Sequence, residues 1–246
     1  MIRVLLWDID NTLLDFDYAE KESLRAEFLE FGLGDFSDEM LEVYMKLNRA
    51  RWQKLERGEM DKKEVLEGRF RELFSLYGMD TRIACEFNDR YQELLGENVA
   101  FRDNSYELIK SLQGKYCLAI ASNGTLKAQT GKLRNSGFDK LFDLFFISEQ
   151  IGFEKPAKEF FDYAFEKINV WLKENEANCT VSGNKYNGLL RREEVLMIGD
   201  SLTSDIRGAV NYGIPVIWYN PKHVDNKSGV NPQFEIDNLS EVPKLL

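Results

Sequence analysis

An apolar segment near the N-terminus, residues 4–7, is followed at once by two carboxylates two positions apart, Asp8 and Asp10. A short apolar run bounded by a polar turn is typical of a buried β-strand that ends in a loop. In parallel-sheet proteins, ligands bind where strands end in this way. Two neighbouring carboxylates repel each other unless a cation lies between them, and Mg²⁺ prefers oxygen ligands. The segment therefore predicts a parallel sheet with a magnesium site at its edge, although Asp-rich surface turns have a similar composition.

Four further apolar runs have the length of buried strands, and a fifth is short enough for an edge strand. They are residues 116–121, 144–147, 195–198, 215–219 and, at the edge, 234–236. Helical patterns fill most of the intervals between them. Strands that alternate with helices form βαβ units, so we expect an α/β protein with a mainly parallel sheet.

Glycine and proline mark several expected helix ends. Gly114, Gly137 and Gly213 each follow a helical pattern and suit the left-handed conformation just past a helix C-terminus. Pro156 suits the first turn of a helix that follows it. These positions predict where helices of the core end and begin.

The interval between the first two expected strands, about 105 residues, is much longer than one crossover helix requires. Apolar residues recur at helical spacing throughout it. They include Leu24, Phe28 and Phe31; Leu66, Phe70, Leu73 and Tyr77; and Ile83, Phe87, Tyr91 and Leu94. Asp61, followed three residues later by Glu64, resembles a helix-capping box. We expect a helical module over residues 16–98, inserted in a core of residues 1–15 and 99–246.

An insertion directly after the acid pair would hang over the strand ends and act as a lid. The alternative is that its helices simply pack on the sheet.

A second polar segment, residues 173–192, is long for a connection between a helix and a strand. A hairpin around residues 182–184 is one arrangement it can adopt, and the sequence assigns it no function.

Charge and composition exclude several classes of protein. A formal net charge of -10 argues against a nucleic-acid partner, because such surfaces rest on clustered Lys and Arg. No apolar run approaches the roughly 20 residues that span a bilayer, and the early acidic residues do not resemble a signal peptide, so a cytoplasmic protein without a membrane partner is expected. The single histidine, His223, excludes multi-histidine zinc sites. Cys85, Cys117 and Cys179 are too widely spaced for a disulfide framework or a metal site.

Polar residues follow each of the expected core strands. They are Asp8 and Asp10 after the first, Ser122 and Asn123 after the second, Lys155 after the third, and Asp200 and Asp205 after the fourth. Because the carboxyl ends of parallel strands meet at one edge, we expect these residues to gather. Taken separately, Ser122 and Asn123 also suit the cap of the next helix, and Asp205 also suits the first turn of a helix over residues 206–212.

The gathered residue types have roles in phosphoryl transfer. A carboxylate needs no deprotonation at pH 7, so Asp8 is the expected nucleophile that forms an aspartyl-phosphate. Asp10 is expected to protonate the leaving oxygen and then to deprotonate the attacking water. Ser122, Asn123 and Lys155 are the expected phosphate-binding residues, and Lys155 also faces Asp8.

The same set contains the ligands of a hard cation. We expect Mg²⁺ to be held by Asp8, the backbone carbonyl of Asp10 and Asp200, with Asp205 as a supporting residue. The cation would neutralise the repulsion between a carboxylate nucleophile and an anionic phosphate. The expected ligand is therefore a small phosphorylated molecule.

Together these motifs closely resemble those of the haloacid dehalogenase superfamily of phosphatases. The matching segments are DIDNT at residues 8–12, SNG at 122–124, KP at 155–156 and GDSLTSD at 199–205. The resemblance implies a Rossmann-like core with helices on both faces of the sheet, a cap inserted after the first strand, Mg²⁺, a nucleophile at Asp8 and an acid/base at Asp10. The dehalogenases that give the superfamily its name lack an acid at the second position, so Asp10 favours hydrolysis of a phosphate monoester.

Two further segments, residues 48–60 and 147–156, resemble the pyrimidine 5′-nucleotidase branch of this superfamily. This narrower resemblance implies a nucleoside 5′-monophosphate as substrate. Asn48, Arg51 and Trp52 are then candidates for contact with base or sugar, or for a plain helix role. The sequence leaves open a phosphomutase, a phosphatase of sugars or small metabolites, a phospho-accepting signalling domain, and the oligomeric state.

Overall fold

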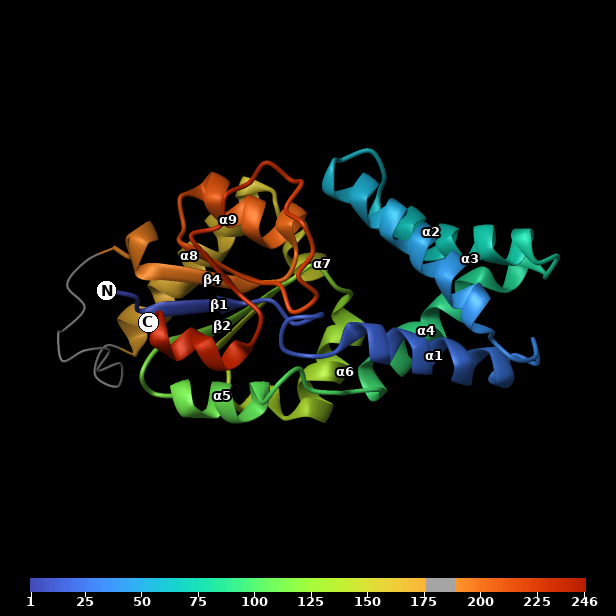
Figure 1. The fold of residues 1–246 in the computed structure, drawn as a ribbon, viewed down its shortest axis with the longest axis horizontal. Coiled ribbons are helices and arrows are strands. Elements are labelled where there is room, and N and C mark those ends of the chain that lie inside the picture. The colour runs from blue at the N-terminus through green and yellow to red at the C-terminus, as the bar shows by residue number, and fades with distance from the viewer. Residues whose placement is uncertain (176–188) are drawn as a thin grey trace.

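A six-stranded parallel sheet forms the centre of the structure, a computed structural model that describes residues 1–175 and 189–246 (Figure 1). The strands are β1 (Val4–Trp7), β2 (Cys117–Ser122), β3 (Leu144–Ile147), β4 (Val195–Gly199), β5 (Val216–Tyr219) and β6 (Phe234–Ile236). Their order is β3-β2-β1-β4-β5-β6, so the chain moves outward from β1 in both directions. Ligands of open parallel sheets bind where the strand order reverses, which here is beside β1. All the runs predicted as strands are strands.

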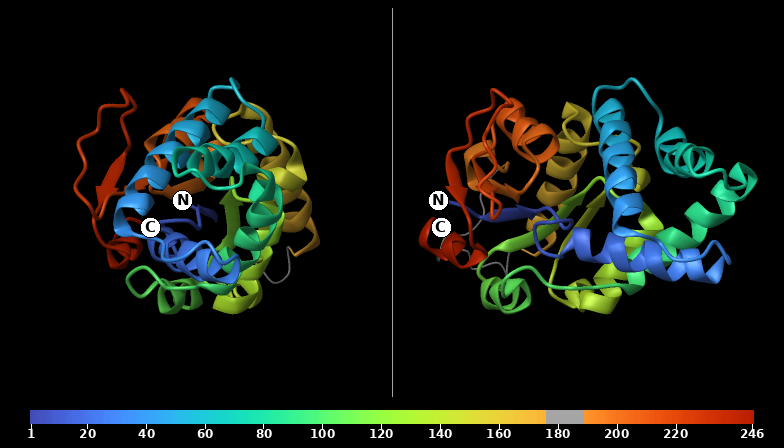
Figure 2. Two further views of the ribbon diagram at one scale, coloured as in Figure 1. Left: turned by 90° about the vertical axis from the view of Figure 1, so that its right-hand side faces the viewer. Right: turned by 45° about the vertical axis from the view of Figure 1, so that its right-hand side comes forward.

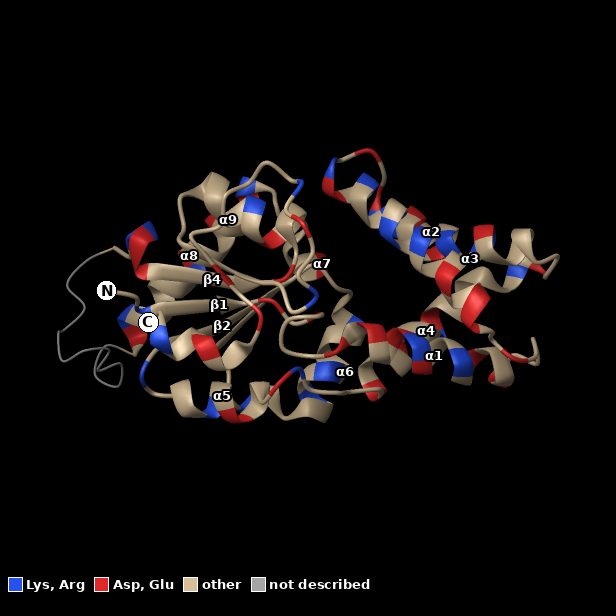
Figure 3. Cartoon of the chain, in the orientation of Figure 1, with Lys and Arg blue, Asp and Glu red and all other residues tan. Residues whose placement is uncertain are grey.

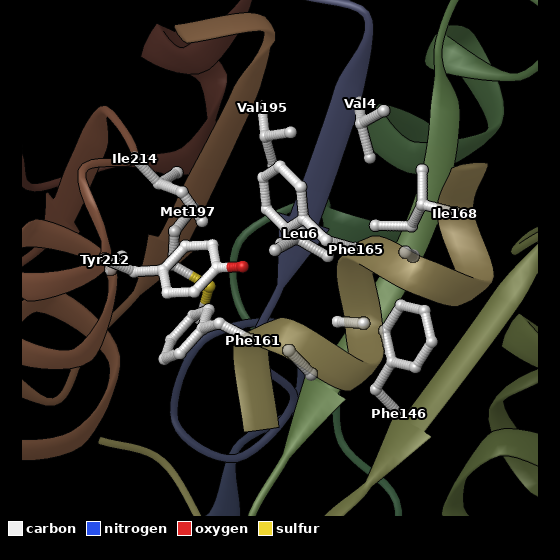
Figure 4. Packing of buried hydrophobic residues seen from close by; sticks show 14 of the residues in the cluster. Val4, Leu6, Phe146, Phe161, Phe165, Ile168, Val195, Met197, Tyr212 and Ile214 are labelled. Atoms are coloured by element: carbon white, nitrogen blue, oxygen red, sulfur yellow. The ribbon is translucent and has the colours of Figure 1, made fainter. Parts of the chain in front are cut away.

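Helices α8 (Lys158–Glu174) and α9 (Arg207–Tyr212) cover one face of the sheet. Successive strand residues point to opposite faces, so alternate residues of β1, such as Leu6, pack toward this side. Phe161 of α8 stacks on Tyr212 of α9, with ring centroids 5.4 Å apart. Figure 4 shows these side chains in one cluster between the helices and the sheet.

Helices α5 (Ser105–Leu112), α6 (Leu126–Ser136) and η6 (Leu239–Lys244) cover the other face, against Leu5 and Trp7 of β1. Short helical turns complete the core: η2 (Phe138–Lys140), α7 (Ser148–Ile151), η4 (Arg192–Glu194) and η5 (Leu202–Ile206). Burial of apolar side chains on both faces is the main stabilising contribution to such a layered fold. The predicted α/β class, a Rossmann-like parallel sheet with helices on both faces, is confirmed.

The glycines predicted to follow helices adopt positive φ angles. They are Gly114, Gly137 and Gly213, with φ of 69°, 77° and 85°. The prediction for Pro156 is wrong, because this residue lies two positions before α8 rather than in its first turn. The helix begins later because the backbone N–H and C=O of Lys155 are both bound by the side chain of Asn123.

The residues between β1 and α5 form a helical layer beyond the carboxyl ends of the strands (Figures 1 and 2). Its helices are α1 (Phe16–Glu30), α2 (Asp38–Glu56), α3 (Lys62–Leu76) and α4 (Ala84–Glu97), with the turn η1 (Thr81–Ile83) before α4. Asp61 caps α3, since its carboxylate accepts a hydrogen bond from the backbone N–H of Glu64 at 2.8 Å.

This layer has a hydrophobic core of its own. Buried aromatic rings fill it, among them Phe28, Tyr44, Phe70, Phe74, Phe87 and Tyr91. The N- and C-termini lie at the opposite end of the sheet (Figure 1). We therefore propose that residues 16–98, the helical insert, form a cap separate from a core of residues 1–15 and 99–246.

The helical insert contacts the core most closely where α4 crosses α6. A Cβ atom built on Gly131 of α6 would lie 2.8 Å from the Cα atom of Gly96 in α4. The two helices therefore touch backbone to backbone. The side-chain amide of Asn135 adds a hydrogen bond to the C=O of Gly96 at 2.8 Å. The insert is thus anchored on the helix that follows β2.

The polar segment at residues 173–192 is described only at its ends. Helix α8 continues through Glu174, and η4 begins at Arg192. The expected hairpin around residues 182–184 and Cys179 lie outside the described residues. Within residues 1–175 and 189–246, no helix combines the length and the apolar character needed to cross a bilayer. The cytoplasmic location expected from the sequence stays a prediction.

Replacing Gly131 by Ala should destabilise the protein by about 1–3 kcal/mol, because the added methyl group would force α4 and α6 apart. In an exposed helix the same substitution would stabilise by about 1 kcal/mol, so the sign of the change tests the close approach. Urea denaturation measures the free energy of unfolding. Thr130→Ala, on the exposed side of α6, is the control and should change it by less than about 0.5 kcal/mol. A Gly131→Ala variant more stable than the wild type would contradict the contact.

Candidate active site

Asp8 and Asp10 lie directly after β1, at the sheet edge that faces the helical insert. The backbone N–H of Asp8 donates to the C=O of Ile198 in β4 at 2.9 Å, which extends the parallel pairing past the strand. Figure 3 shows acidic and basic segments meeting where the strands end. A cavity of about 210 Å³ lies between this edge and the insert.

The cavity brings together residues from the core and from the helical insert. Its core residues are Asp8, Asp10, Ser122, Asn123, Gly124, Thr125, Ala128, Gln129, Lys132, Lys155, Asp200, Ser201, Ser204 and Asp205; its insert residues are Phe16, Asn48, Trp52, Glu56, Leu66, Arg69, Gln92 and Leu95. Of the site residues predicted from the sequence, Arg51 is the one that does not line it.

Lys155 is the central cation of the site and is 1% exposed. Its ammonium lies 2.9 Å from Asp8 Oδ1 and 2.7 Å from Asp205 Oδ1, and it also donates to the C=O of Ala121. Burial alone would lower the pKa of Lys155, but the carboxylates of Asp205 and Asp8 outweigh burial and raise this pKa above its ordinary value. Lys155 is therefore a permanent positive charge beside the expected nucleophile.

Asn123 fixes the backbone of Lys155. Its side-chain Nδ2 donates to the C=O of Lys155, and its Oδ1 accepts from the N–H of Lys155, both at 2.8 Å. This reciprocal pair ties the loop after β2 to the loop after β3. Asn123 lines the cavity and positions Lys155, and its expected contact with phosphate stays a prediction.

Asp8, Asp200 and Asp205 form a carboxylate cluster whose ligand atoms lie within 4.8 Å of one another. Burial and then the charge of Asp205 raise the pKa of Asp8 to about 7, although Lys155 opposes the shift. Burial, reinforced by the charges of Asp8 and Asp205, raises the pKa of Asp200 well above its ordinary value. The ammonium of Lys155 pairs with Asp8 and Asp205, so the cluster has an excess of carboxyl groups over this cation. A set of oxygen ligands with this excess fits a hard divalent cation such as Mg²⁺.

Asp205 reaches the cluster because Gly199 leaves room for it. A Cβ atom on Gly199 would lie 2.3 Å from Asp205 Oδ2. The same oxygen accepts a hydrogen bond from the backbone N–H of Ser201 at 3.0 Å. Asp205 is 1% exposed and lies within η5, so it binds the loop after β4 and Lys155 rather than the first turn of α9. Asp205 also lies in the first turn of η5, which continues into α9, so its contact with Lys155 and the helix-dipole role are compatible.

Asp10 is held by two residues of α6 that sequence reasoning missed. Gln129 Nε2 donates to Asp10 Oδ2 at 2.7 Å, and Lys132 Nζ lies 2.5 Å from Asp10 Oδ1. Lys132 is 2% exposed, which is rare for a lysine unless its charge is paired, as it is here with Asp10. Gly124 makes room for this arrangement, because a Cβ atom there would lie 2.0 Å from Gln129 Nε2. Gln129 and Lys132 are three residues apart on the helix that follows the motif at residues 122–124. This spacing places them on one helix face and could have identified them from the sequence.

Ser122 ends β2 inside the site and is 1% exposed. Its Oγ accepts a hydrogen bond from the backbone N–H of Gly124 at 3.1 Å, which shapes the loop. The N-cap of α6 is Thr125, whose Oγ1 accepts from the N–H of Ala128 at 3.3 Å. The alternative that Ser122 and Asn123 merely cap α6 is therefore wrong.

Helix α2 directs one face into the cavity. Asn48, Trp52 and Glu56 lie four residues apart along it and all line the cavity. Arg51 lies on a different face, where it pairs with Glu72 of α3 at 2.7 Å. Its predicted contact with substrate is therefore not supported, because one residue along a helix turns the side chain by about 100°. Glu56, which the sequence analysis missed, continues the four-residue spacing.

The insert also touches the core through Lys62, at the start of α3. Its ammonium donates to Ser148 Oγ at 2.7 Å and lies 3.4 Å from Glu154 Oε1. Burial lowers the pKa of Lys62, although Glu154 and Glu149 oppose the shift. This contact and the α4–α6 crossing hold the insert over the cavity from two sides.

Comparisons with known proteins identify the family. The family described as haloacid dehalogenase-like hydrolase matches residues 2–213. Pyrimidine 5′-nucleotidase PynA of Streptococcus pneumoniae is 37% identical over 241 residues, which cover 98% of this chain and 93% of PynA. Pyrimidine 5′-nucleotidase YjjG of Escherichia coli is 27% identical over 242 residues, which cover 98% of this chain and 96% of YjjG. The crystal structure of the HAD-hydrolase YfnB from Bacillus subtilis, bound to magnesium, matches with a TM-score of 0.84 and 33% identity, over 100% of this chain and 98% of that one.

The chain belongs to the haloacid dehalogenase-like hydrolases. The matched segment contains every motif on which the resemblance rests, from Asp8 to Asp205. The family assignment agrees with the parallel sheet and with the gathering of carboxylates at its edge.

Replacing Lys155 by Met should destabilise the metal-free protein by about 3–5 kcal/mol at pH 8, because Asp8 and Asp205 would remain buried without their shared cation. The loss should be smaller at pH 5.5. A carboxyl that has lost its cation has a raised pKa in the folded state, so folding takes up protons and gains stability as the pH falls. Urea denaturation in EDTA measures both losses. Lys158→Met, in the exposed pair with Asp162, is the control and should cost less than about 1 kcal/mol. Equal losses in the two variants would contradict the buried cluster.

Proposed function

We propose that the chain hydrolyses the phosphate ester of a pyrimidine nucleoside 5′-monophosphate, with Asp8 as the nucleophile and Mg²⁺ as the cofactor. The observation that carries this proposal is the environment of Asp8. Its carboxylate lines the cavity, lies 2.9 Å from the ammonium of Lys155, and is followed two residues later by Asp10. A carboxylate beside a fixed cation and a second carboxyl group suits attack on phosphorus followed by proton transfer.

The names of two relatives support the substrate class. PynA and YjjG, both named pyrimidine 5′-nucleotidases, match nearly the whole chain, including the helical insert. The names of these relatives and the motifs of the core both indicate the hydrolysis of phosphoric monoesters. The preference for pyrimidine nucleotides is the finer part of the proposal.

Mg²⁺ would be held by the carboxylates of Asp8 and Asp200 and by the backbone C=O of Asp10, with Asp205 in support. When bound, the cation would neutralise charge on the nucleophile and on the phosphate. The carboxylate cluster, which shares one ammonium, supports this fit. The similar protein YfnB has a crystal structure bound to magnesium.

The proposed reaction has two steps, and the side chains return to their starting state after the second. A carboxylate oxygen of Asp8 bonds to phosphorus as the bond between phosphorus and the sugar oxygen breaks, and Asp10 gives its proton to that oxygen. Asp10 then takes a proton from water, which attacks the aspartyl-phosphate and releases Asp8 and inorganic phosphate. Lys155 stabilises negative charge on the phosphoryl oxygens in both steps. Each cycle returns Asp10 to its protonated form.

Lys132 and Gln129 support the second carboxyl group. After Asp10 has given up its proton it is an anion, and Lys132 lies beside one of its oxygens while Gln129 donates to the other. This pairing stabilises the product of the acid step and aligns the same carboxylate for its role as base.

The size of the cavity supports a small organic group. Its volume of about 210 Å³ lies below the roughly 300–1,000 Å³ that is typical of sites for drug-sized ligands. The volume therefore supports a small phosphate monoester, and the preference for a pyrimidine base rests on the names of PynA and YjjG.

With Mg²⁺ present, uridine and cytidine 5′-monophosphates should be hydrolysed with a kcat/KM at least about tenfold above that of adenosine and guanosine 5′-monophosphates, because the larger base meets the cavity wall. EDTA should abolish phosphate release, and added Mg²⁺ should restore it. A colorimetric phosphate assay over these nucleotides measures both effects. A preference for purines would contradict the base assignment alone, whereas activity that survives EDTA would contradict the metal assignment.

Asp8→Asn should lower kcat by more than about 1,000-fold while the fold is retained, because the amide is a far weaker nucleophile. Asp10→Asn should lower kcat by about 100- to 10,000-fold through loss of the acid and base. Acid quenching with phosphate-labelled substrate should trap label on wild-type protein and none on Asp8→Asn. Asp139→Asn, on the exposed surface of the core, is the control. Wild-type turnover in Asp8→Asn would refute the nucleophile.

A further inference from the structure

A connected set of polar side chains lies buried inside the helical insert. Asn48 Nδ2 donates to Glu20 Oε1 at 2.9 Å, and Asn48 Oδ1 accepts a hydrogen bond from Arg69 at 2.9 Å. Asn88 Oδ1 accepts from Arg69 at 3.1 Å and from Gln92 at 3.2 Å. All five side chains are between 2% and 6% exposed. Polar groups in a core cost free energy unless they are paired, so a network of this size points to a use beyond packing.

Three members of this network line the cavity: Asn48, Arg69 and Gln92. Among the described residues, Arg69 has acceptors for three of its five N–H groups, namely the C=O of Leu66 and the side chains of Asn48 and Asn88. The amide nitrogens of Asn48 and Gln92 each have a second N–H besides the one that is bonded. The wall therefore offers donors, and a ligand there must supply acceptors.

The acceptors around Arg69 are carbonyl oxygens. They are the backbone C=O of Leu66 and the side-chain Oδ1 atoms of Asn48 and Asn88. Burial raises the pKa of Glu20 to about 7 and that of Glu27 to about 9, although Arg69 opposes both shifts, so neither carboxyl brings a full negative charge near neutral pH. A carbonyl oxygen on a ligand is an acceptor of the kind that Arg69 already bonds. A carbonyl oxygen accepts hydrogen bonds from Arg69 without adding charge.

The rest of the insert side of the cavity is apolar. Phe16, Trp52, Leu66 and Leu95 line it next to the polar donors. Aromatic and aliphatic side chains around a few fixed donors are the usual surroundings of a planar ring that carries polar groups at its edge. The site therefore suits a planar ring with carbonyl oxygens at its edge.

The network also reaches the loop that is expected to bind phosphate. Thr125 Oγ1 donates to Gln92 Oε1 at 2.7 Å, and Thr125 begins α6 directly after Ser122, Asn123 and Gly124. This bond joins the insert to the phosphate side of the core. It fixes the separation between the donors of the insert and the phosphate site, as required for a ligand with a phosphate at one end and a ring at the other.

We propose that Asn48, Arg69 and Gln92 form the subsite for the substrate base, with Arg69 donating to a carbonyl oxygen of a pyrimidine ring. The inference rests on the proposed function, because it takes the hydrolysed phosphate to lie at Asp8. Arg69 is then a specificity-determining residue, and Glu20 and Asn88 position it. Arg51, which the sequence analysis named as one candidate for substrate contact, has no part in this subsite.

The test compares uridine 5′-monophosphate with ribose 5-phosphate, which has the same sugar and phosphate but no base. The wild type should favour the nucleotide in kcat/KM. Arg69→Gln should reduce this preference by about 10- to 100-fold, chiefly through the KM of the nucleotide. Arg51→Gln, which removes an arginine outside the cavity, is the matched control and should leave the ratio within about twofold.

A structural role for Arg69 gives a different result. Loss of folding or of insert closure would lower the activity toward both substrates together and leave their ratio unchanged, which would overturn the subsite. If Arg69→Gln does not fold, as near-ultraviolet circular dichroism would show, Gln92→Met supplies the test. That variant should lower the same ratio by about three- to tenfold, and an unchanged ratio would overturn the proposal.

The wild type separates this inference from the proposed function. A wild type that hydrolyses ribose 5-phosphate as well as the nucleotide has no selectivity for the base, which overturns the nucleotide assignment and the subsite together. A wild type that prefers the nucleotide, with a preference that survives Arg69→Gln, overturns the subsite and leaves the nucleotidase assignment intact.

Discussion

The site depends on one ammonium group buried among carboxylates. Lys155 lies within 2.9 Å of Asp8 and 2.7 Å of Asp205, and these residues follow three different strands. Without the lysine, the negative charges would be desolvated and would repel one another. The ion pairs therefore join three loops at the sheet edge and place a cation beside the expected nucleophile. Asn123 and Gly199 serve the same arrangement, one by fixing the lysine backbone and the other by leaving space for Asp205.

The place of the helical insert in the chain links it to this edge. Its first helix begins at Phe16, a few residues after Asp10, and its last helix packs through Gly96 on α6. Helix α6 in turn carries Gln129 and Lys132, which hold Asp10. The carboxyl group expected to transfer protons is thus bound by the helix on which the insert rests. A change in the α4–α6 contact would be transmitted to Asp10 through a single turn of helix.

The sequence predicted what local patterns encode. Apolar runs marked every strand, and the order of motifs after them indicated which side chains gather, because parallel strands deliver their loops to one edge. Contacts between helices were beyond this reasoning. Lys132 and Arg69 look like surface residues in the chain, and only the packing of α6 and of the insert buries them. The expected contact of Arg51 with substrate failed for the same reason. The rotation of α2 about its axis decides whether Arg51 faces the cavity or Glu72 of α3.

In the proposed base subsite, burial of the donors explains how the insert would select a substrate rather than only cover it. An exposed arginine loses little when its acceptor is missing, because water replaces the acceptor. Asn48, Arg69 and Gln92 are almost fully buried, so in the proposed subsite a phosphate ester without a suitable ring would leave their remaining N–H groups without an acceptor. Sites of this kind reject the smaller analogue far more strongly than an apolar pocket does. Because Gln92 is bonded to Thr125, a base that satisfies these donors also places its phosphate beside the loop that begins α6. Recognition of the ring and alignment of the ester would then be one event.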